Sequence, residues 1–189
     1  MCNITLYKIK MPGGRLEIII GCMFSGKSSE LARRLKRQRA VGKKVLLINS
    51  KKDTRNFQIH DSGEGQAFEC IKTETLLELV GSIQFKNAEV VAVDESQFFK
   101  GLRNFVVLAL RCNKHVILAG LDGDFKQEIF GELVYMIPLA DEVTKLTALC
   151  MECGDGCTPG PFSKRICDSG VQELVGAADM YKAVCRKHL

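Results

Sequence analysis

One short motif constrains the fold of this chain more than any other part of the sequence. Residues 21–28 read Gly-Cys-Met-Phe-Ser-Gly-Lys-Ser and match the pattern G-x-x-x-x-G-K-[ST]. They follow the apolar, β-branched run Leu16–Ile20 and lead into residues 27–40, which contain helix formers and no Pro or Gly. Glycines let a loop wrap phosphate groups with its N–H donors, and the next helix points its positive N-terminus at the same anion. The motif therefore predicts a phosphate-binding loop between a buried strand and a helix.

A second motif closes another apolar run. Residues 89–94 form an apolar stretch that ends in Asp94, and Glu95 follows directly. In a P-loop enzyme, such an acid and the hydroxyl of Ser28 are the expected partners of Mg²⁺, while Lys27 reaches the β- and γ-phosphates. Because neighbouring strand residues point in different directions, we expect Asp94 to face the metal ion and Glu95 a nucleophile, rather than both facing solvent. These two motifs alone fit an ATPase, a GTPase or a kinase.

The alternation of apolar and helical segments predicts the fold class. Further strands are expected over residues 44–49, 67–72 and 115–120, helices over 74–80 and 102–112, and a loop over 53–65. Strands that are apolar throughout and alternate with helices form parallel sheets covered on both faces. We therefore predict an α/β, P-loop NTPase-like (RecA-like) ATP-binding domain over residues 1–143, with its active site at the carboxyl ends of the strands.

The composition changes at about Thr144. Residues 144–189 are rich in Cys and Gly and hold too few apolar residues to fold well without a staple. Cys150 and Cys153 form a C-x-x-C pair, and Cys185 and His188 form a C-x-x-H pair of the same spacing, as in zinc ribbons. We predict a second, zinc-binding domain in which these residues hold a structural Zn²⁺, against the alternative of unligated thiols.

Cysteine usage and hydropathy indicate the compartment. The chain has nine cysteines but no signal peptide, and no apolar run nears the roughly 20 residues of a membrane helix. We expect a cytoplasmic protein with no membrane partner, in which cysteines hold metal rather than form disulfides. Because His188 is the penultimate residue, Cys157 and Cys167 are alternative fourth ligands.

The net charge of +5 is concentrated in residues 33–44. A solvated helix face near a bound polyphosphate explains this better than a nucleic-acid patch, because no aromatic side chains interleave with the charges. We expect no nucleic-acid partner.

Six motifs occur in the order found in type II (cytosolic) thymidine kinases, and the chain resembles that family from about residue 14 to residue 188. The motifs are Gly21–Leu31, Lys52–Arg55, Asp94–Phe99, Leu121–Phe125, Lys145–Cys153, and Gly176–Tyr181 followed by Cys185. The resemblance implies transfer of the γ-phosphoryl group of ATP to the 5′-hydroxyl of thymidine, for pyrimidine deoxynucleoside salvage. It also implies a homotetramer and feedback inhibition by thymidine triphosphate.

The resemblance also implies roles for individual residues. Glu95 falls on the general base, Arg55 on an arginine that serves the transferring phosphoryl group, and Lys27 completes the catalytic set. The expected contacts with the nucleotide and its metal ion are Gly21, Met23, Phe24, Ser25, Gly26, Lys27, Ser28, Ser29, Asp94 and Gln97. The expected nucleoside contacts are Met23, Phe98, Leu121, Phe125 and Phe130 as walls, Ser163 facing the thymine methyl, the backbone of a lasso loop over Gln172, Glu173, Leu174, Val175 and Gly176, and Tyr181.

The chain departs from the family pattern at a few positions. His188 stands where a cysteine is usual, and residues 154–161 form a longer segment. Asp124 and Lys126 replace neutral polar residues, and Ser96 replaces a glycine. None touches the phosphate-binding loop or the acidic pair, so we expect an active enzyme with an altered lasso and altered feedback control. Two alternatives are a zinc-ribbon P-loop ATPase stimulated by nucleic acid and a non-catalytic interaction module with a relic nucleotide site.

Overall fold

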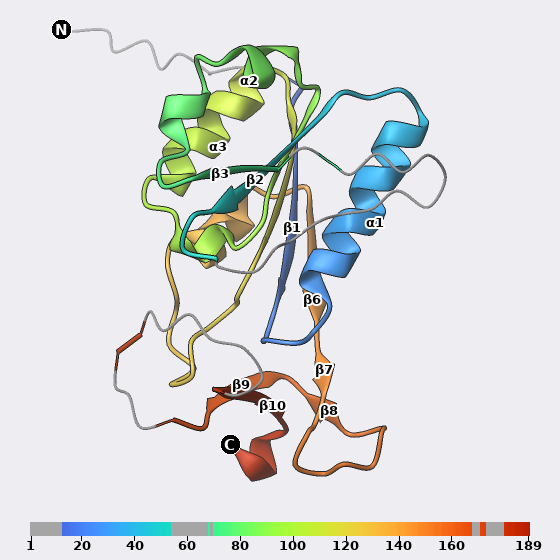
Figure 1. Ribbon diagram of the computed structural model, residues 1–189, viewed down its shortest axis with the longest axis vertical. Coiled ribbons are helices and arrows are strands. Elements are labelled where there is room, and N and C mark those ends of the chain that lie inside the picture. The colour runs from blue at the N-terminus through green and yellow to red at the C-terminus, as the bar shows by residue number, and fades with distance from the viewer. Residues whose placement is uncertain (1–12, 54–67, 69, 168–170, 173–179) are drawn as a thin grey trace, which may run out of the picture.

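A computed structural model of the chain describes residues 13–53, 68, 70–167, 171–172 and 180–189. Its larger part is a parallel sheet of six strands in the order β3-β2-β4-β5-β1-β6 (Figure 1). The strands are β1 (Arg15–Gly21), β2 (Val45–Ser50), β3 (Cys70–Thr73), β4 (Val90–Val93), β5 (His115–Gly120) and β6 (Glu142–Leu146). This sheet and its neighbouring helices confirm the predicted fold class.

Helices cover the sheet on both faces. Helix α1 (Lys27–Ala40) lies on one face, and α2 (Ile83–Asn87) and α3 (Leu102–Arg111) lie on the other (Figure 1). Side chains alternate accordingly along β1, because Ile19 packs in the cluster beneath α1 whereas Ile18 and Ile20 pack in the cluster beneath α3. The near-continuous apolar character of the strands thus follows from burial on both faces.

Within the described residues, the predicted elements agree with the structure except between residues 67 and 88, and the loop expected over residues 53–65 lies outside the described part of the chain apart from Asp53. The helix expected over residues 74–80 is wrong: only the 3₁₀ turn η1 (Leu77–Leu79) forms there, and α2 begins after it. Ser82 starts α2, because its hydroxyl accepts the Phe85 N–H at 3.1 Å, a local cap that competes with a continuous helix. The strand expected over residues 67–72 is observed from Cys70 to Thr73, and residues 67 and 69 lie outside the described part of the chain.

Strand β6 leads from the larger part of the chain into the smaller one. It pairs with β1 along Glu142–Leu146, so the predicted division between residues 143 and 144 falls inside this strand. The smaller part contains β7 (Ala148–Leu149) paired with β8 (Pro159–Gly160), and β9 (Phe162–Arg165) paired with β10 (Tyr181–Val184). Whether residues 144–189 fold as an independent domain stays a prediction.

The carboxyl ends of the central strands face the smaller part (Figure 1). Gly21 ends β1, Asp94 follows β4 and Leu121 follows β5, with the 3₁₀ turn η2 (Ser96–Phe98) after β4. Beyond β5 the chain forms η3 (Leu133–Leu139), and η4 (Arg186–His188) ends it. Within the described residues, no helix is long and apolar enough to cross a bilayer.

Candidate active site

The phosphate-binding loop has the conformation that its glycines allow. Gly26 adopts a left-handed conformation, with φ of 82°, immediately before α1. At Gly21 a Cβ atom would lie 2.3 Å from the Leu146 carbonyl oxygen, so no larger residue fits between β1 and β6 there. The first N–H groups of α1, which have no partner within the helix, therefore lie beside the loop, where they can bind an anion.

Lys27 is held inside this loop. Its Nζ donates to the Cys22 carbonyl oxygen at 2.6 Å, and the residue is 8% exposed. Burial lowers the pKa of the Lys27 ammonium, while the nearby carboxylates of Glu95 and Asp94 act in the opposite direction. The chain thus places a cation against two acids beneath the loop.

The acidic pair follows β4 as expected, and its backbone turns sharply. Glu95 has a φ of 49° and a ψ of 40°, in the left-handed region that residues other than glycine rarely adopt. Its N–H donates to Oδ1 of Asp94 at 2.9 Å, and its Oε2 accepts from Nε2 of Gln97 at 2.6 Å. Oε1 of Gln97 in turn accepts the Leu121 N–H at 3.1 Å. This turn separates the two carboxylates, and Gln97 fixes that of Glu95 relative to β5.

A cavity of about 370 Å³ lies at the carboxyl edge of the sheet. It brings the loop lysine, Glu95 and an aromatic wall together, and within the wall Phe98 and Phe130 pack edge to face with ring centroids 5.5 Å apart. The expected site residues that line it are Met23, Phe24, Gly26, Lys27, Ser28, Ser29, Glu95, Gln97, Phe98, Leu121, Phe125, Phe130, Ser163, Gln172 and Tyr181. A cavity with an apolar wall and a few polar groups at one end suits a flat ring that carries a reactive hydroxyl.

Three expected residues are not part of this lining. Gly21 is buried at the end of β1, Ser25 Oγ donates to the Cys22 carbonyl oxygen, and Asp94 is 1% exposed. Expected site residues that lie outside the described part of the chain are Arg55, Glu173, Leu174, Val175 and Gly176.

Four lining residues were not expected from the sequence: Asp53, Gly123, Asp124 and Arg165. Arg165 lies two residues beyond Ser163 on β9, and this spacing puts both on one face of a strand, a signal that the sequence did contain. Asp53 is fixed by the side chain of Asn49, whose Nδ2 donates to it at 2.9 Å. No sequence pattern foretold that contact.

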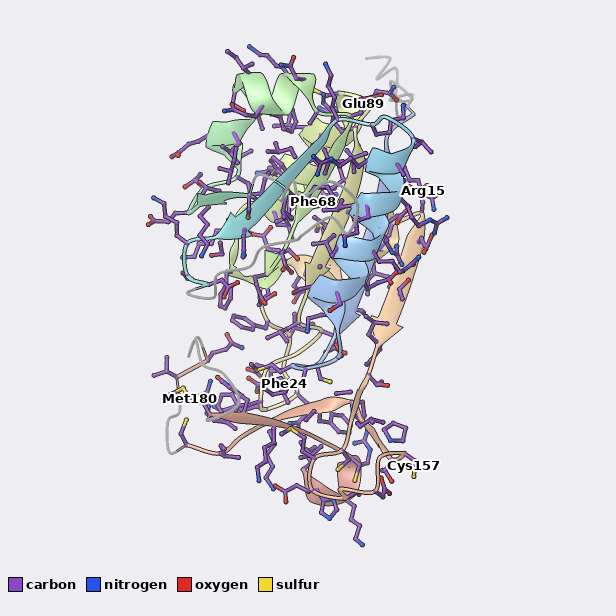
Figure 2. The ribbon with its side chains drawn as sticks, turned by 45° about the vertical axis from the view of Figure 1, so that its right-hand side comes forward. Arg15, Phe24, Phe68, Glu89, Cys157 and Met180 are labelled. Atoms are coloured by element: carbon purple, nitrogen blue, oxygen red, sulfur yellow. The ribbon has the colours of Figure 1, made fainter. Side chains whose placement is uncertain are left out.

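The smaller part of the chain touches the phosphate-binding loop directly. The Met23 N–H donates to Oγ of Ser163 at 2.9 Å, and Sγ of Cys22 donates to the Gly160 carbonyl oxygen at 3.1 Å. Phe24, the next residue of the loop, lies at the level where the two parts meet (Figure 2). Strand β9 therefore contributes to one wall of the site, and β8 and β9 both brace the loop.

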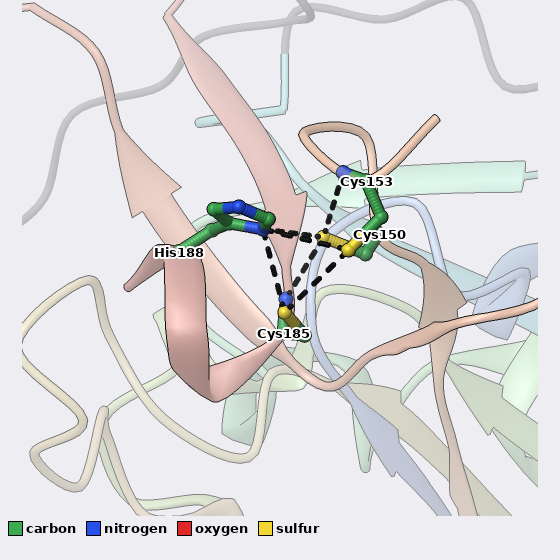
Figure 3. A group of neighbouring side chains, drawn as sticks. All are labelled: Cys150, Cys153, Cys185 and His188. Atoms are coloured by element: carbon green, nitrogen blue, oxygen red, sulfur yellow. Dashed lines mark hydrogen bonds between the residues drawn. The ribbon is translucent and has the colours of Figure 1, made fainter. Parts of the chain in front are cut away.

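The four predicted metal ligands come together in the smaller part (Figure 3). Nδ1 of His188 lies 3.6 Å from Sγ of Cys150 and 3.5 Å from Sγ of both Cys153 and Cys185, and the last two sulfurs are 3.9 Å apart. Ligand atoms on a tetrahedral zinc ion, at about 2.3 Å for sulfur and about 2.0 Å for nitrogen, lie roughly 3.5–3.8 Å from each other. The donor set thus fits Zn²⁺, with His188 as the fourth member, and Cys157 and Cys167 are not part of this cluster.

Backbone donors support the same cluster. The N–H groups of Cys153 and Cys185 point to Sγ of Cys150 at 3.4 and 3.2 Å. Such bonds stabilise a thiolate, the form of cysteine that binds metal.

The chain matches the sequence model of the family described as "Thymidine kinase" over residues 14–189. It is 38% identical to the thymidine kinase of Rabbit fibroma virus (strain Kasza) over 177 residues, which cover 94% of this chain and 97% of that protein. It is 38% identical to the cytosolic thymidine kinase of Cricetulus griseus, covering 92% of this chain and 72% of that one. It is 40% identical to thymidine kinase 1 of Dictyostelium discoideum, covering 92% and 76%.

A solved structure shares the fold at low sequence identity. The flagellar accessory protein FlaH from Methanocaldococcus jannaschii superposes with a TM-score of 0.51 at 16% identity, over 74% of this chain and 73% of that one. That likeness concerns the fold alone, whereas the family match spans the phosphate-binding loop, the acidic pair and the metal cluster. On that match, the chain belongs to the thymidine kinase family.

Proposed function

We propose that this chain transfers the γ-phosphoryl group of ATP to the 5′-hydroxyl of thymidine and so forms thymidine monophosphate. The observation that carries the proposal is the single cavity in which Lys27, Glu95 and an aromatic wall meet. Family membership favours this reaction over the nucleic-acid-stimulated ATPase.

Each residue then has a role that its position supports. The loop and the N-terminus of α1 receive the phosphates of ATP, and Lys27 neutralises charge there. Glu95, oriented by Gln97, accepts the proton of the 5′-hydroxyl as the phosphoryl group is transferred. Arg55 is proposed to act on the same group.

The aromatic part of the cavity receives the pyrimidine ring. Phe98, Phe125 and Phe130 offer flat apolar surfaces, and Leu121 and Met23 complete the wall. Surrounding the acceptor with apolar side chains also keeps water away from the γ-phosphoryl group, which limits hydrolysis of ATP. The backbone of residues 172–176 is proposed to bind the edge of the base.

The donors for two metal ions are available. Ser28 and Asp94 supply a hydroxyl and a carboxylate, the hard oxygen ligands that suit Mg²⁺, which when bound to ATP neutralises charge on the β- and γ-phosphates. Zn²⁺ on Cys150, Cys153, Cys185 and His188 would be structural, because four protein ligands leave no open position.

The site is tested by its acceptor specificity. Labelled ATP is incubated separately with thymidine, deoxycytidine, deoxyguanosine or DNA as the added acceptor. We expect labelled monophosphate to appear with thymidine. ATP hydrolysis that DNA stimulates, with no labelled nucleoside in any reaction, would contradict the proposal.

We further propose a cytoplasmic homotetramer that thymidine triphosphate inhibits. Light scattering coupled to size exclusion measures the mass of the assembly against the 21.0 kDa chain. A titration of the kinase reaction with thymidine triphosphate tests the inhibition. Inhibition as strong as that of family members with a cysteine ligand and a shorter segment at residues 154–161 would contradict the expectation of altered feedback.

A further inference from the structure

Arg165 occupies a place in the cavity wall that the proposed reaction does not by itself explain. It is half-buried on β9, and its guanidinium carbon lies 3.8 Å from the centroid of the Phe125 ring and 5.1 Å from that of Tyr181. At the shorter distance the planar guanidinium covers one face of the Phe125 ring, an arrangement that Arg adopts and Lys cannot reproduce. Arg165 therefore packs on an aromatic ring that belongs to the expected base-binding wall, and Nζ of Lys126 lies farther from the same ring, at 5.5 Å from its centroid.

The N–H groups of the same guanidinium point to the protein rather than to the cavity. Nη1 donates to the Val171 carbonyl oxygen and Nη2 to the Gln172 carbonyl oxygen at 3.2 Å. Nε donates to the hydroxyl of Tyr181 at 3.1 Å, and Nη2 makes a second bond to that hydroxyl. Arg165 thus links Val171 and Gln172, which precede residues 173–179 in the chain, to Tyr181, which follows them.

A second anchor holds Gln172 from the loop after β5. Its Nε2 donates to Oδ2 of Asp124 at 2.6 Å. Asp124 is buried, and its Oδ1 accepts the N–H groups of Lys126 and Glu128 at 2.8 and 3.0 Å, so the carboxylate itself cannot rotate freely. Gln172 is therefore fixed through its main chain by β9 and through its side chain by the loop after β5.

We infer that Arg165 is a positioning residue for nucleoside binding, which clamps the carbonyls of Val171 and Gln172 and the hydroxyl of Tyr181 against Phe125. The inference rests on the proposed function, because it assigns Arg165 to the nucleoside end of that cavity. Arg165 acts through these neighbours and not on the reacting atoms. Its loss weakens the binding of thymidine in the ground state and the transition state alike, which raises KM and leaves kcat nearly unchanged.

The experiment compares steady-state kinetics of the full-length wild type with Arg165→Met, Arg165→Lys and Tyr181→Phe. Arg39→Met is the matched control, because Arg39 also lies over an aromatic ring, that of Phe68 at 4.9 Å, but does not line the cavity. For Arg165→Met we expect a KM for thymidine raised about tenfold, the loss of one charge-assisted anchor, with the KM for ATP unchanged. Arg39→Met leaves both KM values as in the wild type.

Arg165→Lys and the double variant Arg165→Met/Tyr181→Phe test whether the geometry of the clamp matters or only its positive charge. Lysine keeps the charge but lacks the planar fork that reaches these separated acceptors while it covers a ring face, so Arg165→Lys should show nearly the KM of Arg165→Met. Because Tyr181→Phe removes one acceptor of the clamp, its effect on KM should largely vanish when Arg165 is already methionine. A wild-type KM for thymidine in Arg165→Lys would overturn the inference, and so would additive effects of Arg165→Met and Tyr181→Phe on that KM.

Failure of the inference is distinguishable from failure of the proposed function. A wild type that does not phosphorylate thymidine contradicts the proposed function, and the inference with it. An active wild type whose KM for thymidine is unchanged in Arg165→Met contradicts the inference alone, as does a lowered melting temperature with both KM values unchanged. If Arg165→Met does not fold, Arg165→Lys decides: a higher KM for thymidine at constant KM for ATP supports the clamp, and an unchanged one overturns it.

Discussion

At the scale of single residues, Glu95 combines a strained backbone with a fixed carboxylate in the cavity. Its backbone is in the left-handed region, a conformation that costs an ordinary residue of order 1 kcal/mol, and its carboxylate is fixed by Gln97 inside the cavity. Strained backbone of this kind gathers at functional sites, because the surrounding structure must compensate for it. The geometry thus agrees with the role of general base that we propose.

The role of Glu95 predicts a specific kinetic change. Glutamine has the shape of glutamate and can still accept the Gln97 bond, but it cannot take a proton at neutral pH. In Glu95→Gln we expect kcat to fall by a factor of about 10² to 10⁴ while the affinity for ATP is retained. Stopped assays of thymidine phosphorylation and equilibrium binding of an ATP analogue measure the two quantities.

The matched control is Glu74→Gln, which alters a side chain that is 74% exposed and is not part of the cavity. It should leave both quantities unchanged. A kcat near that of the wild type in Glu95→Gln would remove Glu95 from the catalytic step.

At the scale of elements, one buried carboxylate joins β1 to α1 and β5. Glu17 accepts from Nη1 of Arg34 at 2.6 Å and Nε of Arg15 at 2.8 Å, and it lies 3.0 Å from Nε2 of His115. Within the described part of the chain, Arg34 also contacts the hydroxyl of Thr144 and the carboxylates of Glu30 and Glu142. The hydrogen bond with His115, and then those from Arg15 and Arg34, hold the pKa of Glu17 well below its usual range against the opposing effect of burial.

This network predicts how stability depends on pH. Because the pKa of Glu17 is lower in the folded chain than the value of about 4.3 in the unfolded chain, its contribution is complete above that value and is lost as the pH falls further. Glu17→Gln should lower the free energy of unfolding at pH 7 by about 2 kcal/mol and flatten the loss of stability below about pH 4. Urea denaturation between pH 7 and pH 3 measures both effects.

An exposed ion pair provides the control for Glu17. Glu89 pairs with Lys43 at 2.7 Å, with about half of each side chain exposed, so Glu89→Gln should affect unfolding much less. If the free energy of unfolding falls equally with pH in the wild type and in Glu17→Gln, Glu17 does not govern the loss of stability in acid.

At the scale of the whole molecule, the metal cluster and the phosphate-binding loop are linked through a few contacts. Cys150 follows β7, which pairs with β8, and the Gly160 carbonyl oxygen of β8 accepts from the Cys22 thiol. Ser163 of β9 accepts the Met23 N–H. The metal ion is therefore expected to stabilise one wall of the active site although it lies outside the cavity.

Removal of the metal tests this link. His188→Ala leaves three ligands, whereas His188→Cys offers a fourth thiolate, and both Cys₄ and Cys₃His sets hold structural zinc. We expect His188→Cys to retain one zinc ion per chain. His188→Ala should lose zinc, melt roughly 10 °C lower and bind an ATP analogue more weakly. Zinc content by mass spectrometry, melting curves and binding titrations measure these changes, and full zinc occupancy in His188→Ala would rule out His188 as a ligand.

Local patterns in the sequence predicted most of the framework. The apolar runs that became β1, β2, β4 and β5, the helix that begins at Lys27, and the C-x-x-C and C-x-x-H pairs are all recognised within a few residues of chain. Each depends on backbone propensity, side-chain periodicity or ligand spacing, which short stretches carry in themselves. The same reasoning was wrong for the helix over residues 74–80, where only the 3₁₀ turn Leu77–Leu79 forms and the α-helix starts later, after its cap at Ser82.

Only the tertiary structure decided which side chains contact one another around the cavity. Arg165 and Asp124 are 41 residues apart in the chain, and they meet at Gln172 because β9 lies against the loop after β5. Nor does any spacing in the sequence bring Ser163 to Met23, 140 residues away. Such contacts depend on how distant segments pack, whereas the sequence by itself determined the phosphate-binding loop, the order of the central strands and helices along the chain, and the C-x-x-C and C-x-x-H pairs, because those follow from local chemistry.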